Sequence, residues 1–425
     1  MNDVLVAVAD RLVMGDIRRD RRGRLTFVYD DNWRSTDGAY PLSLSMPLVV
    51  AEHEHAKIEP WLWGLLPDNE AILGRWGQRF HVSPRNAFAL LGAVGEDCAG
   101  AVQLVRPGRV EEILKDVSPH VEWLTEGDVA ERLRILRKDP AAWRVARDTG
   151  QFSLAGAQPK TALLFDGRRW GVPSGLTPTT HILKPPIDAF DGHVENEHLC
   201  LALARALDLP AAGSEVLKFE DEVAFVVERY DRVRTTDTIR RLHQEDLCQV
   251  LGLPPTKKYQ NEGGPGCSEM IEAIRTHSGE PRQDVWTFAR ALALNWIIGG
   301  TDAHAKNFSM LIGAGGRARL APLYDVASTL PYDFDPRKLR MATKIGGKYR
   351  LEEIGSRQWN KFASEARLPA AEVLDMCKSM AETLPGALKK TVEEARAEGL
   401  DHPIAKQMVD VLSERAERCT RILGS

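Results

Sequence analysis

Thr301-Asp302-Ala303-His304-Ala305-Lys306-Asn307-Phe308 follows an apolar segment, Val285 to Ile298, that ends in a pair of glycines. We expect the apolar segment to be a helix, so that the loop emerges from a rigid base. An asparagine at the fifth position after an aspartate is the spacing of the catalytic loop of protein kinases. There the aspartate accepts or orients the proton of the attacking hydroxyl, and the asparagine oxygen holds Mg²⁺. The spacing alone fits an Asx-rich turn that caps a helix equally well.

Two further side chains of this loop are candidates for contact with a phosphate. Ordinary kinases usually carry lysine two positions after the catalytic aspartate, whereas here His304 stands at that place and Lys306 follows two positions later. Which of the two meets the γ-phosphate stays open. Asp302, His304 and Lys306 are therefore the candidate catalytic residues, and Asn307 is a candidate metal ligand.

A second carboxylate strengthens the kinase interpretation. Leu320 to Val326 is typical of a strand that ends at an acidic residue, Asp325. In kinases a strand separates the catalytic loop from the metal-binding aspartate, and Asp325 takes that place without the usual Phe-Gly after it. Taken by itself, Tyr324-Asp325 is more typical of a turn. Together with Asn307, however, Asp325 gives hard oxygen ligands that suit Mg²⁺ and not zinc.

An upstream loop, Ser153 to Thr161, stands directly before a predicted strand and is rich in small residues. Small side chains let backbone N–H groups approach an anionic ligand, as a phosphate-binding loop requires. The loop has neither a Walker A pattern nor the kinase glycine-rich pattern, so a plain hairpin loop is the alternative. As candidate ATP-binding residues we take Ala155, Gly156, Ala157, Gln158 and Lys160.

The remaining candidates lie farther along the chain. Lys184 ends a predicted strand, where a kinase places the lysine that contacts the α- and β-phosphates. Its partner is expected from the next helix, with Glu197 preferred over Glu195. After the following strand, backbone groups of Glu228 and Tyr230 are predicted to bind adenine at an inter-lobe hinge. For Lys184 and its glutamate partner, the alternative is a solvent-exposed lysine and a glutamate favoured by the helix dipole.

The pattern of elements predicts an α+β, two-lobed protein-kinase-like fold. Residues 1–110 are expected to form a β-rich subdomain, because Val4 to Val13 and Leu25 to Tyr29 alternate around a turn at Arg21 to Gly23, and Val102 to Val105 resembles a further strand. Residues 111–150 are expected to be a helical connector. Residues 151–243 are predicted as a lobe of short strands with one helix, and residues 244–425 as a helical lobe that carries the catalytic and metal-binding loops. The predicted elements of the strand lobe are strands at 162–165, 181–184, 216–219 and 224–228, and a helix at 195–207.

Composition excludes several other classes of protein. Among the 425 residues, 43% are hydrophobic and 27% are charged, which is typical of a folded globular protein. The formal net charge of -4 provides no basic footprint for nucleic acid, and the run Arg18 to Arg24 is interpreted as a solvated hairpin tip. Six scattered cysteines without a C-x-x-C pair indicate reduced thiols. No apolar run approaches the length of a membrane span, and the residues from Met1 to Asp10 lack the apolar region of a signal peptide. We therefore expect a cytoplasmic protein with no membrane partner.

These motifs together resemble the HipA family. The phosphate loop from Ser153 to Leu164 is closely similar to that of HipA, apart from Pro159, where family members commonly carry glutamate. The resemblance covers nearly the whole chain in the right order. Its other motifs are Pro41 to Leu48, Gly64 to Pro67, Thr179 to Lys184, Glu195 to Glu197, Gln244 to Asp246, Lys258-Tyr259 leading into Gly263 to Gly266, Thr301 to Ser309, and Tyr324-Asp325.

The resemblance implies a PI-kinase-like fold and phosphorylation of protein serine with ATP and Mg²⁺. It also implies a toxin that inhibits growth by modifying a translation protein, typically an aminoacyl-tRNA synthetase, and a small helix-turn-helix antitoxin, HipB. DNA binding is expected only indirectly, through that antitoxin. The resemblance places an autophosphorylated serine at Ser153, where modification would switch the kinase off. The alternatives are a small-molecule kinase of the same fold and an inactive, kinase-like corepressor.

Overall fold

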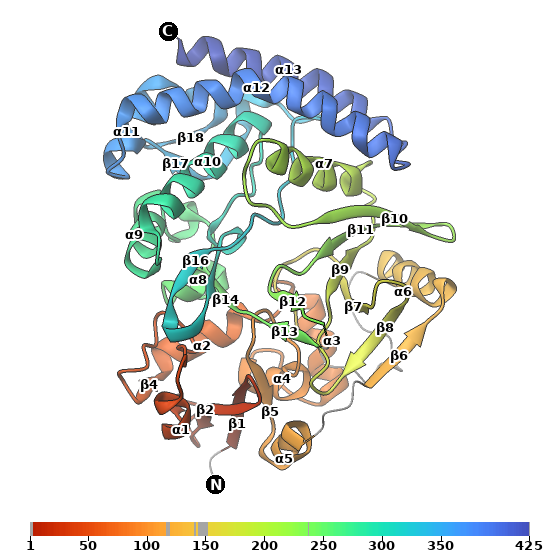
Figure 1. The fold of residues 1–425 in the computed structure, drawn as a ribbon, viewed down its shortest axis with the longest axis vertical. Helices are drawn as coiled ribbons and strands as arrows, with labels where there is room; N and C mark the ends of the chain where they lie inside the picture. Colours follow the sequence, from red (N-terminus) through yellow and green to blue (C-terminus); the bar gives the residue numbers. More distant parts are fainter. Residues whose placement is uncertain (1–2, 116–119, 140–141, 143–151, 237, 425) are drawn as a thin grey trace. The chain divides into compact units, whose positions relative to one another are not determined.

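The computed structural model describes residues 3–115, 120–139, 142, 152–236 and 238–424. The chain divides into two compact units, and each is described by itself. The N-terminal unit comprises residues 1–185, 218–255 and 310–318, and the C-terminal unit comprises residues 186–217, 256–309 and 319–425. Both sheets and helices are present, which confirms the predicted α+β class (Figure 1).

A five-stranded sheet opens the N-terminal unit, with the order β4-β3-β2-β1-β5. The prediction of one strand from Val4 to Val13 is wrong, because the chain turns at Asp10 and Arg11, which both have positive φ angles. The predicted hairpin around Arg21 to Gly23 is present between β2 and β3, and the predicted strand near Val105 pairs with β1. The strands are β1 (Asp3–Ala9), β2 (Leu12–Arg19), β3 (Leu25–Tyr29), β4 (Glu52–Glu54) and β5 (Gln103–Val105).

Five helices accompany this sheet, and the sequence analysis predicted none of them except the end of α5, which falls in the predicted helical connector. α2 contacts β3, and α4 contacts β5. Asn69 and Asn86 each cap a helix by accepting backbone N–H bonds at its first turn, a signal that could have located both starts. The helices are α1 (Asp31–Ser35), α2 (His55–Gly64), α3 (Glu70–Phe80), α4 (Ala87–Val94) and α5 (Pro107–Lys115).

A six-stranded sheet follows, with the order β10-β11-β9-β7-β8-β6. Its first strand falls inside the predicted helical connector, since residues 120–124 pair with β8 along their whole length. The connector is therefore not purely helical. The four strands predicted for this lobe are present, and β8 was missed. The elements are β6 (His120–Leu124), α6 (Glu126–Lys138), β7 (Thr161–Phe165), β8 (Trp170–Ser174), β9 (His181–Lys184), β10 (Ser214–Phe219) and β11 (Glu222–Glu228).

Short elements complete the N-terminal unit and carry the chain between the units. The chain passes from one unit to the other inside β10, β15 and β16. The short elements are β12 (Arg232–Arg234), β13 (Ile239–Arg241), β14 (His243–Asp246), α8 (Leu247–Val250), β15 (Ser309–Ile312) and β16 (Ala318–Leu320).

The C-terminal unit is mainly helical. Its central helix, α10, begins with a proline and is buried along most of its length, as the apolar segment predicted. α7, predicted as part of the strand lobe, packs on α12 and α13 instead. The helices are α7 (His193–Ala206), α9 (Cys267–His277), α10 (Pro281–Ile298), α11 (Ser356–Glu365), α12 (Ala370–Ala397) and α13 (Ile404–Leu423), beside strands β17 (Arg340–Ile345) and β18 (Lys348–Arg350). No helix in the described part of the chain has the length and apolar character that crossing a membrane requires.

Candidate active site

The loop that follows α10 is fixed at its start by two glycines. Gly299 ends the helix with φ 67°, and the N–H of Gly300 donates to the carbonyl oxygen of Asn295 at 2.7 Å. A Cβ atom on Gly300 would lie 2.1 Å from Oδ1 of Asn295, so no larger residue fits there without a shift. The loop that follows therefore starts at a fixed position at the end of α10.

Asn307 closes the loop back on Asp302. Its Nδ2 donates to the carbonyl oxygen of Asp302 at 2.8 Å, and its backbone N–H donates to the carbonyl oxygen of His304 at 2.9 Å. Because the side-chain amide is planar, its oxygen points away from the Asp302 carbonyl. An amide oxygen is one of the ligand types that Mg²⁺ binds.

His304 is buried, with 4% of its surface exposed, and its Nε2 lies 4.0 Å from Oδ2 of Asp302. Burial lowers the pKa of His304 below its usual value, against the opposing effect of the Asp302 charge. The ring is therefore uncharged at neutral pH and does not supply a fixed positive charge for a phosphate. Lys306, the other candidate, is buried on the same loop.

Asp325 lies in an irregular segment and not at the end of a strand, so that prediction was wrong. β16 ends at Leu320, and beyond it only Leu323 makes an isolated bridge. Pro322 lacks the N–H that a continued ladder needs. Asp325 itself has φ 56°, a strained conformation for a residue with a side chain.

Tyr324 joins this segment to the catalytic loop. Its hydroxyl donates to the carbonyl oxygen of Lys306 at 2.6 Å and accepts from the Ser309 hydroxyl at 2.6 Å. Asp325 also lies near enough to His304 to affect the pKa of that ring. Sequence reasoning quoted Tyr324 within a motif but gave it no role.

Helix α7 holds the next part of the same segment. Asn196 exchanges two hydrogen bonds with the backbone of Ser328, at 2.8 and 2.9 Å. The neighbouring Glu197 is buried with 2% exposure, whereas Glu195 is only partly buried, and the preference for Glu197 over Glu195 stays a prediction. Asp302, His304, Lys306, Asn307 and Asp325 thus lie on connected segments of the C-terminal unit.

The remaining predicted site residues belong to the N-terminal unit. Ser153 is fully buried, and its hydroxyl donates to the carbonyl oxygen of Leu65 at 2.7 Å. Gly156 has φ 102°, a conformation that glycine adopts readily. Nε2 of Gln158 is buried and has no hydrogen-bond partner among the described residues, so this loop holds a donor that suits an anionic ligand.

Two lysines lie at the same end of a strand pair beside this loop. Thr161 pairs with Leu183 in antiparallel register, so Lys160 and Lys184 flank the pair at one edge. Nζ of Lys160 donates to the carbonyl oxygen of Ala155 at 2.9 Å, and both lysines are largely buried. Two cationic side chains therefore lie at one end of this strand pair.

The predicted hinge follows β11. The N–H of Arg229 donates to the carbonyl oxygen of Thr180 at 2.9 Å. The carbonyl of Glu228 belongs to the same trans peptide group as that N–H and therefore points to the opposite side. Tyr230 lies in a turn, which is closed by the N–H of Arg232 donating to the carbonyl oxygen of Arg229 at 3.1 Å. The binding of adenine by the backbone of Glu228 and Tyr230 stays a prediction.

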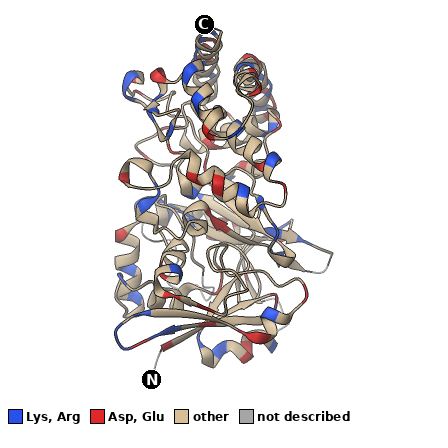
Figure 2. Ribbon diagram, turned by 90° about the vertical axis from the view of Figure 1, so that its left-hand side faces the viewer, with Lys and Arg blue, Asp and Glu red and all other residues tan. Residues whose placement is uncertain are grey.

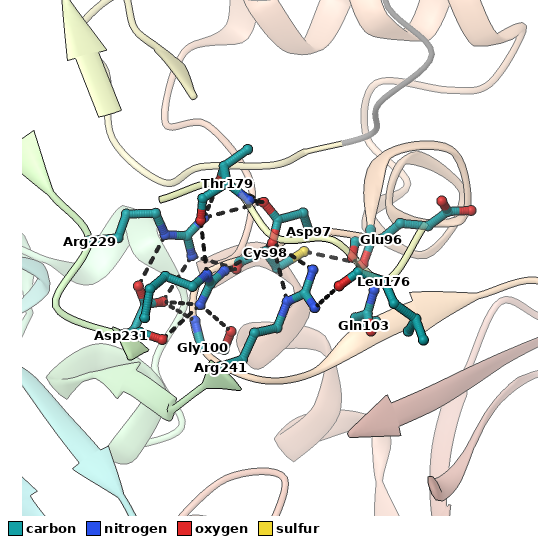
Figure 3. Close-up of polar contacts among 12 residues, drawn as sticks. Glu96, Asp97, Cys98, Gly100, Gln103, Leu176, Thr179, Arg229, Asp231 and Arg241 are labelled. Atoms are coloured by element: carbon teal, nitrogen blue, oxygen red, sulfur yellow. Dashed lines mark hydrogen bonds and ion pairs between the residues drawn. The ribbon is translucent and has the colours of Figure 1, made fainter. Parts of the chain in front are cut away.

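A buried ionic cluster, which the sequence analysis did not predict, holds the residues that follow β11 (Figure 3). Asp97 contacts Arg232 at 2.9 Å and Arg241 at 3.2 Å, and Arg229 contacts Asp231 at 2.9 Å. Burial acts to raise the pKa of Asp97, but the charges of Arg232, Arg229 and Arg241 outweigh it and lower that pKa. We call these five residues the Asp97 cluster. Asp97 lies far along the chain from the other four residues, so no local sequence pattern indicated the cluster.

The described residues contain no group of three or more His, Cys, Asp or Glu side chains arranged to hold a metal. Mg²⁺ does not need such a group, because it takes several ligands from water and substrate phosphates. The Asn307 oxygen and the Asp325 carboxylate have the donor chemistry for it.

Two family models match the chain: the HipA-like C-terminal domain over residues 152–388 and the HipA N-terminal domain over residues 5–105. A protein described as "Putative kinase Y4mE", from Sinorhizobium fredii, is 36% identical over 415 residues, covering 96% of each chain. The "Serine/threonine-protein kinase toxin HipA" of Shewanella oneidensis is 27% identical over 430 residues, covering 97% of this chain and 94% of that protein.

A solved structure shows the same fold. It is the HipA, HipB and operator DNA complex of the Shewanella oneidensis toxin–antitoxin system, which matches with a TM-score of 0.85 at 24% identity over 99% of this chain and 98% of that one. This match confirms the fold predicted from the sequence. Together with the two family models and the relative of 36% identity, it leads to one conclusion: the chain belongs to the HipA family.

Proposed function

We propose that this protein is an ATP-dependent protein serine/threonine kinase. The observation that carries the proposal is the loop from Asp302 to Asn307, which is closed by the Asn307–Asp302 hydrogen bond and joined to the Asp325 segment through Tyr324. The loop supplies the Asp302 carboxylate for a substrate hydroxyl and the Asn307 oxygen for a metal. The joined segment supplies the Asp325 carboxylate as a second metal ligand. Names of relatives, a toxin kinase and a putative kinase, support the same activity.

Each residue has a distinct role in the proposed reaction. Asp302 accepts the proton of the substrate hydroxyl while that oxygen attacks the γ-phosphorus. Lys160, Lys184 and the Gln158 amide hold the phosphates, and the backbone at Glu228 and Tyr230 holds adenine. Mg²⁺ held by Asn307 and Asp325 would neutralise the negative charge of the phosphates.

The substrate we propose is a serine in a translation protein, such as an aminoacyl-tRNA synthetase, and the regulatory partner is a HipB-like antitoxin. The resemblance supports the substrate class, and the HipA, HipB and DNA complex supports the partner. DNA would be bound through the antitoxin, because basic and acidic residues are interspersed along the ribbon in Figure 2 and the net charge is -4. We place the proposed reaction in the cytoplasm.

The test uses purified protein with Mg·ATP and a cell extract, followed by phosphoproteomics. We expect new phosphoserine with the unchanged protein and with Asp375→Ala, an exposed aspartate on α12, and a loss of about 10²–10⁴-fold in rate for Asp302→Ala. ATP turnover without protein phosphorylation would favour a small-molecule kinase. No transfer by the unchanged protein would favour the inactive corepressor.

A further inference from the structure

A tyrosine outside the predicted site contacts the proposed catalytic base. The hydroxyl of Tyr259 donates to Oδ1 of Asp302 at 2.5 Å. We propose that Tyr259 is a positioning residue, which holds Oδ1 and leaves Oδ2 as the oxygen that receives the substrate proton. This inference rests on the proposed kinase activity.

The loop that carries Tyr259 is built around it. The Tyr259 carbonyl oxygen accepts from the N–H groups of Glu262 at 3.1 Å and Gly264 at 2.9 Å. A Cβ atom on Gly264 would lie 2.0 Å from the Lys257 carbonyl oxygen, so glycine is required at this close approach. The kinase assignment left the glycine-rich run from Gly263 to Gly266 unexplained. Its role follows from these contacts, because it folds the chain tightly enough to aim Tyr259.

The same loop is joined directly to the catalytic loop. The N–H of Ala305 donates to the carbonyl oxygen of Lys258 at 3.3 Å, one residue before Tyr259. The Tyr259 ring also lies edge-on to the His304 ring, with centroids 4.9 Å apart. Two independent contacts thus fix the tyrosine relative to the loop that carries Asp302.

The carboxylate of Asp302 needs such a support. Its side chain is 66% exposed, so packing alone does not select one rotamer. His304 lies on the Oδ2 side at 4.0 Å, and its ring is held in turn by Tyr259. If the Asp302 side chain moved between rotamers, the reaction rate would fall, because a displacement of about 1 Å can cost on the order of 10²-fold in rate.

The chemical step shows which oxygen must be available. The substrate O–H bond breaks, its proton moves to Oδ2 of Asp302, and the oxygen forms a bond to the γ-phosphorus. The bond between that phosphorus and the bridging oxygen breaks, and its electron pair leaves with ADP. Because Tyr259 occupies Oδ1 as a donor, it does not compete with the substrate for Oδ2.

The test compares Tyr259→Phe with Tyr349→Phe. Both remove one phenol hydroxyl from the C-terminal unit, and Tyr349 lies on β18, outside the proposed site. We expect kcat for protein phosphorylation to fall about 10-fold to 100-fold in Tyr259→Phe only. The KM for ATP and the melting temperature should stay the same, because the change removes a hydrogen bond to an exposed carboxylate.

A double-mutant cycle separates positioning from a general structural role. In the Asp302→Ala background, Tyr259→Phe should cause no further loss of the residual rate, since its target is gone. A similar fall in both backgrounds, or a kcat within about twofold of wild type for Tyr259→Phe, overturns the inference alone.

Gly264→Ala keeps the hydroxyl but moves the loop, and it should lower kcat in the same way. A normal kcat in that variant also counts against the inference. Absence of transfer by the unchanged protein overturns the proposed function together with it.

Discussion

Glu245 is a carboxylic acid with no exposed surface. The N–H of Leu44 donates to its Oε1 at 2.6 Å, while Oε2 has no hydrogen-bond partner among the residues that the structure describes. Burial raises the pKa of Glu245 to about 8, with a smaller contribution from the nearby charge of Asp246. The folded protein therefore binds a proton at neutral pH that the unfolded chain releases.

This linkage predicts how stability depends on pH. Because the folded pKa lies above the unfolded value of 4.5, the protonated acid contributes fully below pH 4.5, and its contribution is lost as pH rises through 8. Glu245→Gln keeps the acceptor for Leu44 and cannot ionise. We expect the free energy of unfolding of wild type relative to this variant to fall by up to roughly 4 kcal/mol between about pH 5 and 9.

Urea unfolding at about pH 5, 7 and 9 measures this difference. Glu372→Gln, an exposed site on α12, is the matched control and should show no such trend. A constant difference between wild type and Glu245→Gln across these pH values would contradict the shifted pKa.

Ser153 gives the second prediction at this scale. In the described conformation its hydroxyl is buried against Leu65, so a phosphate, which adds about -1.5 to -2 charges, does not fit there. Phosphorylation must therefore hold the loop outside this conformation and disturb the donors at Gln158 and Lys160. We expect one added phosphate on Ser153 after incubation with Mg·ATP, and none in Asp302→Ala.

Intact mass and peptide mapping detect the modification, and calorimetry measures its effect. Ser153→Asp should lose ATP affinity, whereas Ser379→Asp, at an exposed site on α12, should not. An unmodified Ser153 in enzyme that still phosphorylates its substrate would rule out this switch.

At the scale of elements, glycine positions distinguish a constrained loop from an open helix. Gly300→Ala would place Cβ 2.1 Å from the Asn295 side chain, so the start of the catalytic loop must shift. A Cβ atom added to Gly386, within α12, would have no atom from outside its own helical turn within 4 Å. Gly300→Ala should cost about 1–3 kcal/mol of stability and on the order of 10²-fold in phosphorylation rate.

Gly386→Ala should instead stabilise the protein by roughly 0.5–1 kcal/mol, because alanine is the better helix former. Thermal melting and rate measurements on the two variants check both expectations. Equal rates for the two would show that the glycine at the end of α10 does not position the loop.

The sequence predicted elements whose information is local. The apolar run of α10, its terminal glycine and the Asp302–Asn307 spacing all lie within a few turns of one another, so the helix and the candidate loop were found. The roles of Tyr324 and Tyr259 were not, because each depends on a contact with a residue that another loop supplies. The strand predicted before Asp325 failed for a related reason: an apolar pattern does not show that a strand partner is present.

At the scale of the N-terminal unit, the Asp97 cluster joins segments that are distant in the sequence. Asp97 lies in the loop before β5, whereas Arg229, Arg232 and Arg241 lie after β11. The backbone of Asp97 also accepts the N–H of Ser153 at 2.9 Å. One residue therefore connects the phosphate loop with the segment that we propose binds adenine.

Asp97→Ala tests the weight of this connection. The change leaves three buried guanidinium groups with Asp231 as the only carboxylate of the cluster, and breaking a buried pair in this way costs about 3–5 kcal/mol. Asp16→Ala, which removes a partly exposed partner of Arg18, is the control and should cost about 0–1 kcal/mol. Urea unfolding gives both values. Asp97→Asn keeps one of the two acceptor oxygens, which can serve either the arginines or Thr179, and places a donor NH₂ group at the other position. It should therefore retain more stability than alanine while the surplus positive charge still loosens this segment. Calorimetry with adenosine should then show weaker binding for Asp97→Asn than for Asp16→Ala. If adenosine binds equally to both variants, the cluster stabilises the fold without shaping the nucleotide site, and the link between Asp97 and the hinge has only a structural role.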